Sequence, residues 1–259
     1  NDFHGRIDAN TVAFAGTVEE QRAAASGPVL FLSAGDNIGA SLFASSVAQD
    51  QPTIDVLNAL GLQASAVGNH EFDRGFADLA GRVSDESDYP QLGANVYQKG
   101  TQTPALDEYA LLDAGGLTVG VIGAVTEETP SLVSPAGITE VDFGDPVAAV
   151  NRVAAQLSDG DASNGEADVL VALYHEGAGA GTPDGATLEQ ELAAGGAFAA
   201  LVNDTSADVD AIFTGHTHKE YAWSAAVPGT DRTRPVVQTG SYGANIGKIV
   251  LAIDPDSGE

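Results

Sequence analysis

The residues with the greatest capacity for chemistry stand in the stretch Gly68-Asn69-His70-Glu71-Phe72-Asp73, directly after the short apolar run 64–67. An amide, an imidazole and two carboxylates fall within six residues. Such groups can bind a metal ion, transfer a proton and orient the group that carries the proton. Because α/β proteins commonly build their sites in loops that leave strands, matching side chains at other strand ends would complete such a site.

Four further loops carry similar side chains, and the five loops together hold all five histidines of the chain. The added loops supply Asp2 and His4, Asp36, His175, and His216 with His218. Two residues separated by one in an extended segment point to the same side, so the His216 and His218 rings can aim at one point. The same spacing relates Asp2 to His4. A carboxylate such as Asp36 is suited to bridge two cations.

The kinds of donor in these loops narrow the choice of metal. The chain has no cysteine, so a transition metal must be held by imidazole, carboxylate and amide groups. Mixed nitrogen and oxygen donors favour Zn, Mn, Fe, Co or Ni over the all-oxygen cages of Mg or Ca.

The elements expected around these loops alternate along the chain. The sequence pattern predicts helices over 12–25, 45–60, 74–83, 146–157 and 187–202. It predicts strands over 28–33, 64–67, 91–96, 109–112, 117–124, 168–174, 208–213, 221–227, 235–239 and 246–253. Asp145 is the expected N-cap of the helix that begins at Pro146. The pattern predicts an α/β (α+β) fold, a four-layer αββα sandwich of two mixed sheets flanked by helices, in one domain over 1–259.

Composition limits the partners of this chain. With 259 residues and 43% hydrophobic content the chain can bury a large core. A net charge of −27, from 37 acidic and 10 basic residues, repels duplex nucleic acid and anionic membrane surfaces. A phosphate substrate would therefore need local positive charge, which a pair of metal ions could supply. No apolar stretch approaches the ~18 residues of a membrane span.

The five motifs, in this order, resemble the metal-binding motifs of the calcineurin-like metallophosphoesterases. They are Asn-Asp-Phe-His-Gly, Gly-Asp-Asn, Gly-Asn-His-Glu-Phe-Asp, His-Glu-Gly and Gly-His-Thr-His. The first and third resemble in particular the catalytic domain of the 5′-nucleotidase family, which includes UDP-sugar hydrolases and 2′,3′-cyclic phosphodiesterases. The resemblance extends over nearly the whole chain.

The resemblance implies a role for each residue. One of two divalent metal ions, Zn or Mn before Fe, Co or Ni, would bind Asp2, His4 and His218. The other would bind Asn69, His175 and His216, with Asp36 as the bridge. His70 and Asp73 would form a catalytic dyad in which Asp73 orients the His70 ring, and Asn69 and His70 would also contact the substrate.

The implied function is hydrolysis of a small nucleotide or other phosphate ester by attack of a metal-bound hydroxide. Alternatives are a non-catalytic metal-binding scaffold module, a cyclic-nucleotide phosphodiesterase and a nuclease of the same superfamily. The dyad argues against the scaffold, and the negative charge argues against the nuclease. The resemblance also implies an extracellular, periplasmic or cell-surface location.

Some of these residues also have a purely structural interpretation. Asp36 and Asp73 could be helix N-caps, and His175 could be a histidine satisfied at a strand end. For Glu71 a structural role is favoured. Arg6 is interpreted as an ordinary solvated side chain. Asn95 and the segment 238–245 lie near expected strand ends and could line the cleft, but structural roles are favoured for them.

Two departures from the family pattern stand out. Family members carry a strand before the first motif and a C-terminal nucleoside-binding domain, whereas here Asp2 is the second residue and the chain has no methionine. We expect a processed or excised piece of a longer protein, without that strand and that domain. A chain end is often poorly ordered, so weak metal binding at Asp2 is an expectation.

Overall fold

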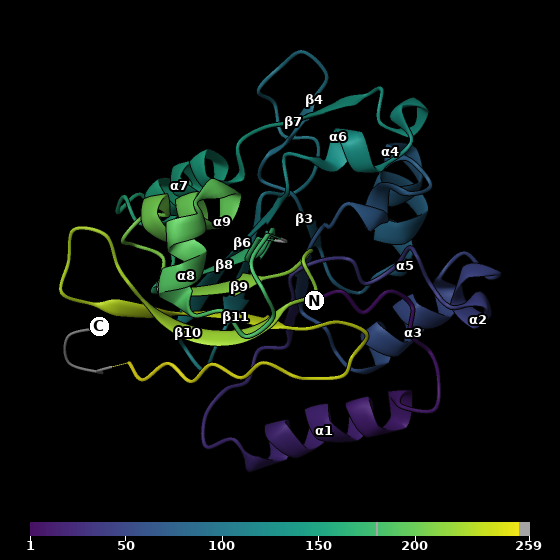
Figure 1. Cartoon of the computed structure of the whole chain (residues 1–259), viewed down its shortest axis with the longest axis horizontal. Coiled ribbons are helices and arrows are strands. Elements are labelled where there is room, and N and C mark those ends of the chain that lie inside the picture. The colour runs from purple at the N-terminus through teal and green to yellow at the C-terminus, as the bar shows by residue number, and fades with distance from the viewer. Residues whose placement is uncertain (180, 254–259) are drawn as a thin grey trace.

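The protein is built around two sheets that pack face to face (Figure 1). The computed structural model describes residues 1–179 and 181–253. The larger sheet has six strands in the order β10-β11-β9-β8-β6-β5. Its inner strands are parallel, and β5 and β10 are antiparallel edges. The strands are β5 (Tyr109–Asp113), β6 (Thr118–Val125), β8 (Val169–His175), β9 (Ala211–Thr214), β10 (Glu220–Ala226) and β11 (Thr233–Thr239).

The smaller sheet has the order β1-β2-β3, and both of its strand pairs are parallel. Its strands are β1 (Leu32–Ser33), β2 (Ala64–Ala66) and β3 (Gln91–Leu92), and a separate antiparallel pair is formed by β4 (Val96–Gln98) and β7 (Val141–Phe143). The predicted αββα sandwich is confirmed. Within this sandwich the three strands of the smaller sheet are parallel, and the larger sheet is mixed.

Helices cover the two outer faces of the sandwich. In Figure 1, α7, α8 and α9 lie on one side of the molecule and α3, α4 and α5 on the other. The α-helices are α1 (Thr11–Ala24), α2 (Phe43–Ser46), α3 (Gln51–Ala59), α4 (Phe76–Asp78), α5 (Ser84–Glu86), α6 (Thr129–Leu132), α7 (Pro146–Leu157), α8 (Leu188–Ala194) and α9 (Gly196–Asp204). Within the described residues, no helix has the length and apolar character needed to cross a membrane.

The central strand β8 is buried on both faces and explains the near-continuous apolar run in its sequence. Its alternate side chains Val169, Val171 and Leu173 pack toward the smaller sheet, against residues such as Ala66. The alternate side chains Leu170, Ala172 and Tyr174 pack on the other face, against α7 and α9. Packing on both faces fixes the position of the carboxyl end of β8, and the candidate site lies at that end.

Several elements differ from the sequence expectation for local reasons. The helix expected over 187–202 is broken into α8 and α9 because Gly195 and Gly196 adopt positive φ values of 73° and 79°. The strand expected over 28–33 shrinks to two residues, because the Phe31 amide donates to the Gln63 side chain instead of a strand. The stretch expected to be helical over 74–83 contains α4 and then a π-helix over Leu79–Val83.

Two expected strands also need correction. The strand expected over 91–96 is divided between β3 and β4, which belong to different sheets. The segment 246–253 forms no strand, although it is extended and packs Ile249 and Ile253 on the core between the sheets. The preceding strand β11 is already paired on both sides, so it offers no free edge to this segment.

The connection between α9 and β9 is held by a buried arginine. The Arg234 side chain, 1% exposed, donates to the carbonyl oxygens of Ser206, Val209, Val202 and Thr205. These carbonyls lie at the end of α9 and in the turn after it, where a helix leaves acceptors unsatisfied. The guanidinium therefore fixes the path of the chain into β9.

We predict that Arg234→Met lowers the free energy of unfolding by about 3 kcal/mol, because buried carbonyl groups lose their donor. Urea unfolding followed by circular dichroism measures the change. Arg22→Met is the control, because the Arg22 side chain is 27% exposed and pairs with Glu19 near solvent, and it should cost less than about 1 kcal/mol. Equal losses in the two variants would contradict the role given to Arg234.

Candidate metal centre

The side chains predicted to form the site gather at the carboxyl ends of parallel strands from both sheets. Asp36 follows β1 and Asn69 follows β2 in the smaller sheet. His175 is the last residue of β8, and the loop with His216 and His218 follows β9 in the larger sheet. Because the two sheets pack face to face, their strand ends bring these loops together.

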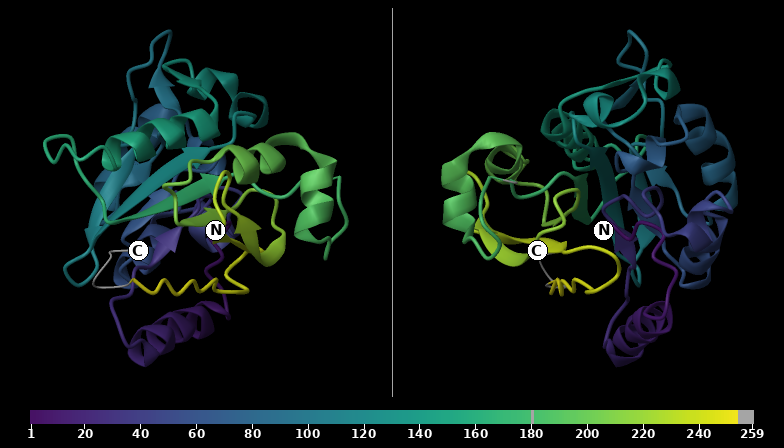
Figure 2. Two further views of the ribbon diagram at one scale, coloured as in Figure 1. Left: turned by 90° about the vertical axis from the view of Figure 1, so that its left-hand side faces the viewer. Right: turned by 45° about the vertical axis from the view of Figure 1, so that its right-hand side comes forward.

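The N-terminal segment is anchored rather than frayed. The amides of Asp2 and His4 donate to the carbonyl oxygens of Gly35 and Asp36, each at 2.9 Å. The amide of Tyr242 donates to the Asp2 carbonyl at 2.7 Å. Asp2 is 0% and His4 is 2% exposed, and the N-terminus lies in the middle of the molecule (Figures 1 and 2). The first motif is therefore ordered in this structure, and weak metal binding at Asp2 stays a prediction.

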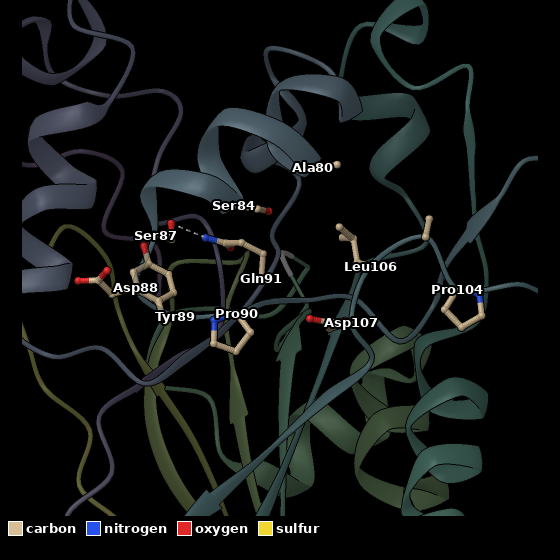
Figure 3. Close-up of a pocket in the computed structure, with 11 residues that line it drawn as sticks. Ala80, Ser84, Ser87, Asp88, Tyr89, Pro90, Gln91, Pro104, Leu106 and Asp107 are labelled. Carbon is tan, nitrogen blue, oxygen red and sulfur yellow. Dashed lines mark hydrogen bonds between the residues drawn. The ribbon is translucent and has the colours of Figure 1, made fainter. Parts of the chain in front are cut away.

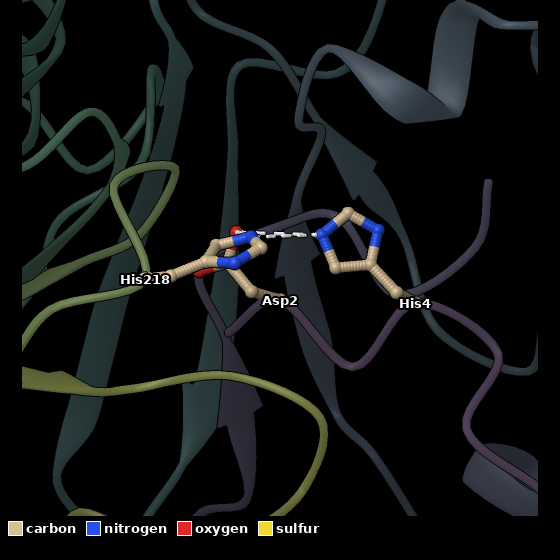
Figure 4. A group of neighbouring side chains, drawn as sticks. All are labelled: Asp2, His4 and His218. Carbon is tan, nitrogen blue, oxygen red and sulfur yellow. Dashed lines mark hydrogen bonds and ion pairs between the residues drawn. The ribbon is translucent and has the colours of Figure 1, made fainter. Parts of the chain in front are cut away.

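Asp2, His4 and His218 form a first group of possible metal ligands (Figure 4). The Nε2 atoms of His4 and His218 face each other at 3.1 Å, and they lie 3.8 and 3.4 Å from Asp2 Oδ1. The Nδ1 atom of His4 lies 3.0 Å from the Gly39 carbonyl oxygen, which can only accept. That contact places the proton on Nδ1 and leaves the Nε2 lone pair facing the group. Such converging lone pairs suit a cation.

Asp36, His175 and His216 form a second group. His175 Nδ1 lies 2.8 Å from the Ala34 carbonyl oxygen, so Nε2 faces the group. That Nε2 atom lies 3.1 Å from Asp36 Oδ2 and 3.2 Å from the Asn69 side-chain oxygen. Asp36 Oδ2 is also 3.7 Å from His4 Nε2. The Asp36 carboxylate therefore lies between the two groups.

The buried charges shift the pKa values of both second-group histidines. Burial by itself lowers the pKa of His175, but the Asp36 carboxylate outweighs burial and raises that pKa to about 10. Burial and the neighbouring His175 charge lower the pKa of His216 to about 4. Despite burial, the same His175 charge holds the pKa of Asp36 below its usual value. A metal ion would thus compete with a proton on His175.

His70 and Asp73 form a hydrogen-bonded pair at the rim of these groups. His70 Nδ1 lies 2.8 Å from Asp73 Oδ2, and the two side chains are 31% and 36% exposed. The hydrogen bond to Asp73 raises the pKa of His70 above its usual value. The His70 ring lies 5.1 Å from the His4 ring, centroid to centroid. His70 is therefore the solvent-accessible imidazole beside the first group.

Glu71 is a structural residue, as favoured from the sequence. Its buried carboxylate accepts from the amides of Asp36 and Asn37 at 2.9 and 2.8 Å, and from the amide of Gly68. Burial and the Asp36 charge raise the pKa of Glu71 to about 7, while its amide donors act in the opposite direction. Glu71 thus holds the loops after β1 and β2 side by side.

Close approach of these loops depends on glycine. A Cβ atom at Gly68 would lie 2.1 Å from Asp36 Oδ1, and one at Gly35 would lie 2.8 Å from His175 Nδ1. Neither contact could be relieved without moving a residue of the two groups.

The sequence interpretation missed a contact from the C-terminal part of the chain. The Tyr242 ring lies 5.8 Å from the His4 ring and 5.4 Å from the His218 ring. Tyr242 also adopts a φ of 64°, which is rare for a non-glycine residue. Its position between two glycines was the available signal, since Gly-Ser-Tyr-Gly after a strand indicates a tight loop.

Two cavities border different parts of the molecule. A cleft of about 850 Å³ reaches His218 and is also lined by Arg6, Lys219, Trp223 and Tyr242. A second cavity of about 750 Å³ lies between residues 80–91 and 104–107, and none of the predicted site residues lines it (Figure 3). The first cleft is therefore the candidate space for a substrate.

Comparisons of the sequence with protein families and with known proteins agree with one another. The family model described as calcineurin-like phosphoesterase matches residues 1–220. The chain is 30% identical over 98% of its length to endonuclease YhcR of Bacillus subtilis, and it spans 21% of that protein. It is 29% identical over 93% of its length to the 5′-nucleotidase of Vibrio vulnificus, and it spans 44% of that protein.

The fold also matches solved structures. NAD nucleotidase (NadN) of Haemophilus influenzae superposes with a TM-score of 0.69 and 20% identity over 94% of this chain and 44% of that one. At this identity the likeness concerns the fold. The chain spans less than half the length of each of these three proteins.

We predict that Glu71→Gln lowers the free energy of unfolding by about 2 kcal/mol, because one side-chain oxygen becomes an amide group that faces backbone donors. The measurement is urea unfolding in the presence of a chelator, so that bound metal does not contribute. Glu86→Gln on α5 is the control and should be nearly neutral. If Glu71→Gln were as stable as the control, the hydrogen bonds from the loop amides to Glu71 would be unimportant to the fold.

Proposed function

This chain belongs to the calcineurin-like phosphoesterase family, and from that premise we propose that it hydrolyses phosphate esters of nucleotides in the manner of a 5′-nucleotidase. The observation that carries the proposal is the position of Asp36 Oδ2, 3.7 Å from His4 Nε2 and 3.1 Å from His175 Nε2. One carboxylate thus joins two groups of converging donors. The 5′-nucleotidase among the relatives supports the nucleotide as substrate.

The proposed cofactors are two divalent metal ions, Zn or Mn, with Fe, Co or Ni as alternatives. Asp2, His4 and His218 would hold one, Asn69, His175 and His216 the other, and Asp36 would bridge them. Two adjacent cations lower the pKa of water and offset the negative charge of a phosphoryl group. The donor set fits this role, since both His4 and His175 use Nδ1 for a backbone carbonyl and keep Nε2 for the site.

The proposed catalytic residue is His70, with Asp73 as its positioning partner. The contact between His70 Nδ1 and Asp73 Oδ2 fixes the ring and leaves Nε2 to reach the substrate. A protonated His70 can donate to a phosphoryl oxygen or to the oxygen of the leaving group. Asn69 and His70 would then both contact the phosphoryl group.

We also propose that residues 1–259 form one catalytic domain of a longer protein. The greater length of the relatives supports a further, C-terminal domain that contributes to substrate binding. An extracellular, periplasmic or cell-surface location is proposed from the family resemblance.

A second candidate is a nuclease or cyclic-nucleotide phosphodiesterase with the same metal centre. The endonuclease among the relatives favours it, whereas the net charge of −27 opposes binding of a nucleic acid strand. A non-catalytic metal-binding scaffold is less well supported, because it has no use for the exposed His70–Asp73 pair.

We predict that chelation abolishes hydrolysis of AMP and p-nitrophenyl phosphate, and that Mn or Zn restores it, because the site needs cations to offset its carboxylates. Released phosphate is measured for AMP, and the products formed from 2′,3′-cyclic AMP and from single-stranded DNA are separated by chromatography, because hydrolysis of a phosphodiester releases no inorganic phosphate. A faster rate on single-stranded DNA would favour the second candidate. No metal-dependent turnover on any substrate would sink the proposed function.

We predict that His70→Ala keeps two bound metal ions but loses about 10² to 10⁴ in kcat, the range for removal of a general acid. Asp73→Asn should lose less, because the ring remains in place. Metal content by atomic emission and kcat for AMP are measured together, with Asp85→Asn as the control. Metal loss in proportion to activity would mean that His70 supports the metals rather than the reaction.

A further inference from the structure

Arg6 is unlike the other basic residues of this protein. Among the residues that the structure describes, it is the only lysine or arginine whose side chain has neither an ion pair nor a hydrogen bond. The other nine of the 10 basic side chains each have a partner, and they are Arg22, Arg74, Arg82, Lys99, Arg152, Lys219, Arg232, Arg234 and Lys248. In a chain of net charge −27, an unpaired guanidinium is unexpected.

The position of Arg6 is fixed by an aromatic ring. Its guanidinium carbon lies 3.9 Å from the centroid of the Tyr242 ring, which is a close cation–π contact. Its Nε atom is buried without a hydrogen-bond partner among the described residues. The same Tyr242 ring contacts the His4 and His218 rings. Arg6 is therefore held one ring away from the first group of candidate ligands.

Arg6 is among the residues that line the cleft reaching His218. Four acidic side chains also line the cleft, and three of them have partners, whereas Asp184 has none among the described residues. Glu191 pairs with Lys219 at 2.9 Å, and Glu220 accepts from Asn245 at 3.0 Å. Asp8 accepts from a backbone amide of its own turn. Within the described lining of this cleft, Arg6 is the basic group left to bind an anion.

We propose that Arg6 recognises a second phosphoryl group, one joined to the phosphoryl group that is cleaved, as in a nucleoside diphosphate. The inference rests on the proposed function. One aromatic ring separates Arg6 from His4 and His218, so an anion at the metal-ligand groups and an anion at Arg6 are neighbours rather than the same group. A guanidinium binds phosphoryl oxygens through two parallel donors, which matches this role.

The reaction that follows is balanced by water alone. A water oxygen bonds to the terminal phosphorus as the bond from that phosphorus to the bridging oxygen breaks, and the proton that the water loses passes to the departing oxygen or to solvent. The bridging oxygen leaves with the electron pair on the nucleoside monophosphate, and the products are that monophosphate and inorganic phosphate. Arg6 would offset the charge of the departing phosphoryl group.

The test compares AMP and ADP, which share base and ribose and differ by one phosphoryl group. In Arg6→Gln we expect kcat/KM for ADP to fall by about 10- to 100-fold, mainly through KM, because a charge-assisted contact is lost. The value for AMP should stay within about twofold, since its leaving group carries no phosphoryl group. Arg6→Lys should recover only part of kcat/KM for ADP, because an ammonium group lacks the two parallel donors of a guanidinium. The control is Arg22→Gln, which makes the same substitution on α1.

A binding measurement separates this proposal from the proposed function. Trp223 is the only tryptophan of the chain and lines the same cleft, so its fluorescence can report titration of metal-free protein with AMP and with ADP. We expect tighter binding of ADP in the wild type and equal binding in Arg6→Gln. If the wild type turns over neither nucleotide but shows this difference, the proposed function fails and the role of Arg6 stands. Equal loss for AMP and ADP, or no loss for either, would overturn the proposal for Arg6.

Discussion

Two buried carboxylates lie at the centre of this protein, and the arrangement of the site depends on how their charge is offset. Asp2 is 0% and Asp36 is 2% exposed, and no lysine or arginine of the described residues pairs with either. Their neighbours are imidazoles instead, and the Asp36 charge overcomes burial to raise the pKa of His175 to about 10. Two carboxylates so placed cannot both remain charged without a compensating cation close by. Protons on histidine can do this in the free protein, and divalent metal ions can do it better because each carries two charges.

The backbone is strained where these groups converge. Among the described residues, nine that are not glycine have positive φ, and five of these nine are Asp2, His4, Asp36, His216 and His218. Such conformations cost about 1 to 3 kcal/mol each and persist only where the surroundings enforce them. Here the enforcing contacts are backbone hydrogen bonds from the N-terminal segment to 35–37, together with the Glu71 carboxylate that binds the same loop. The packing of the buried strands thus offsets the free-energy cost of the strained backbone, which holds the donor atoms in a fixed arrangement.

The sequence predicted some parts of this structure better than others. The helix at Pro146 was predicted with its limits and its N-cap, because the capping carboxylate, the proline and the apolar spacing are all local signals. The hairpin around Asp113 was likewise predicted, since its turn residues lie between two apolar runs. The strand expected over 246–253 was wrong, because strand pairing depends on which edges are free, and that is a property of the assembled sheet. For the candidate site, residue types and spacing identified which side chains lie together. Their strain, the Glu71 clamp and the carbonyl partners of His4 and His175 come from distant segments and have no local signature.

The surroundings of Arg6 also come from a distant segment and could not be predicted from the sequence around it. From the sequence it is a basic residue in a polar loop, and solvation is the simplest account of such a residue. The structure changes that account, because a ring from position 242 covers the guanidinium and the candidate ligands lie beyond that ring. Each of the other basic side chains has an acceptor, either a carboxylate or a neutral oxygen such as the Ser46 carbonyl that binds Arg74. A cation that stays unpaired next to a space for substrate is held there by packing rather than by charge. The overall negative charge of the chain disfavours large anions, whereas a single positive group such as Arg6 can favour a particular small anion.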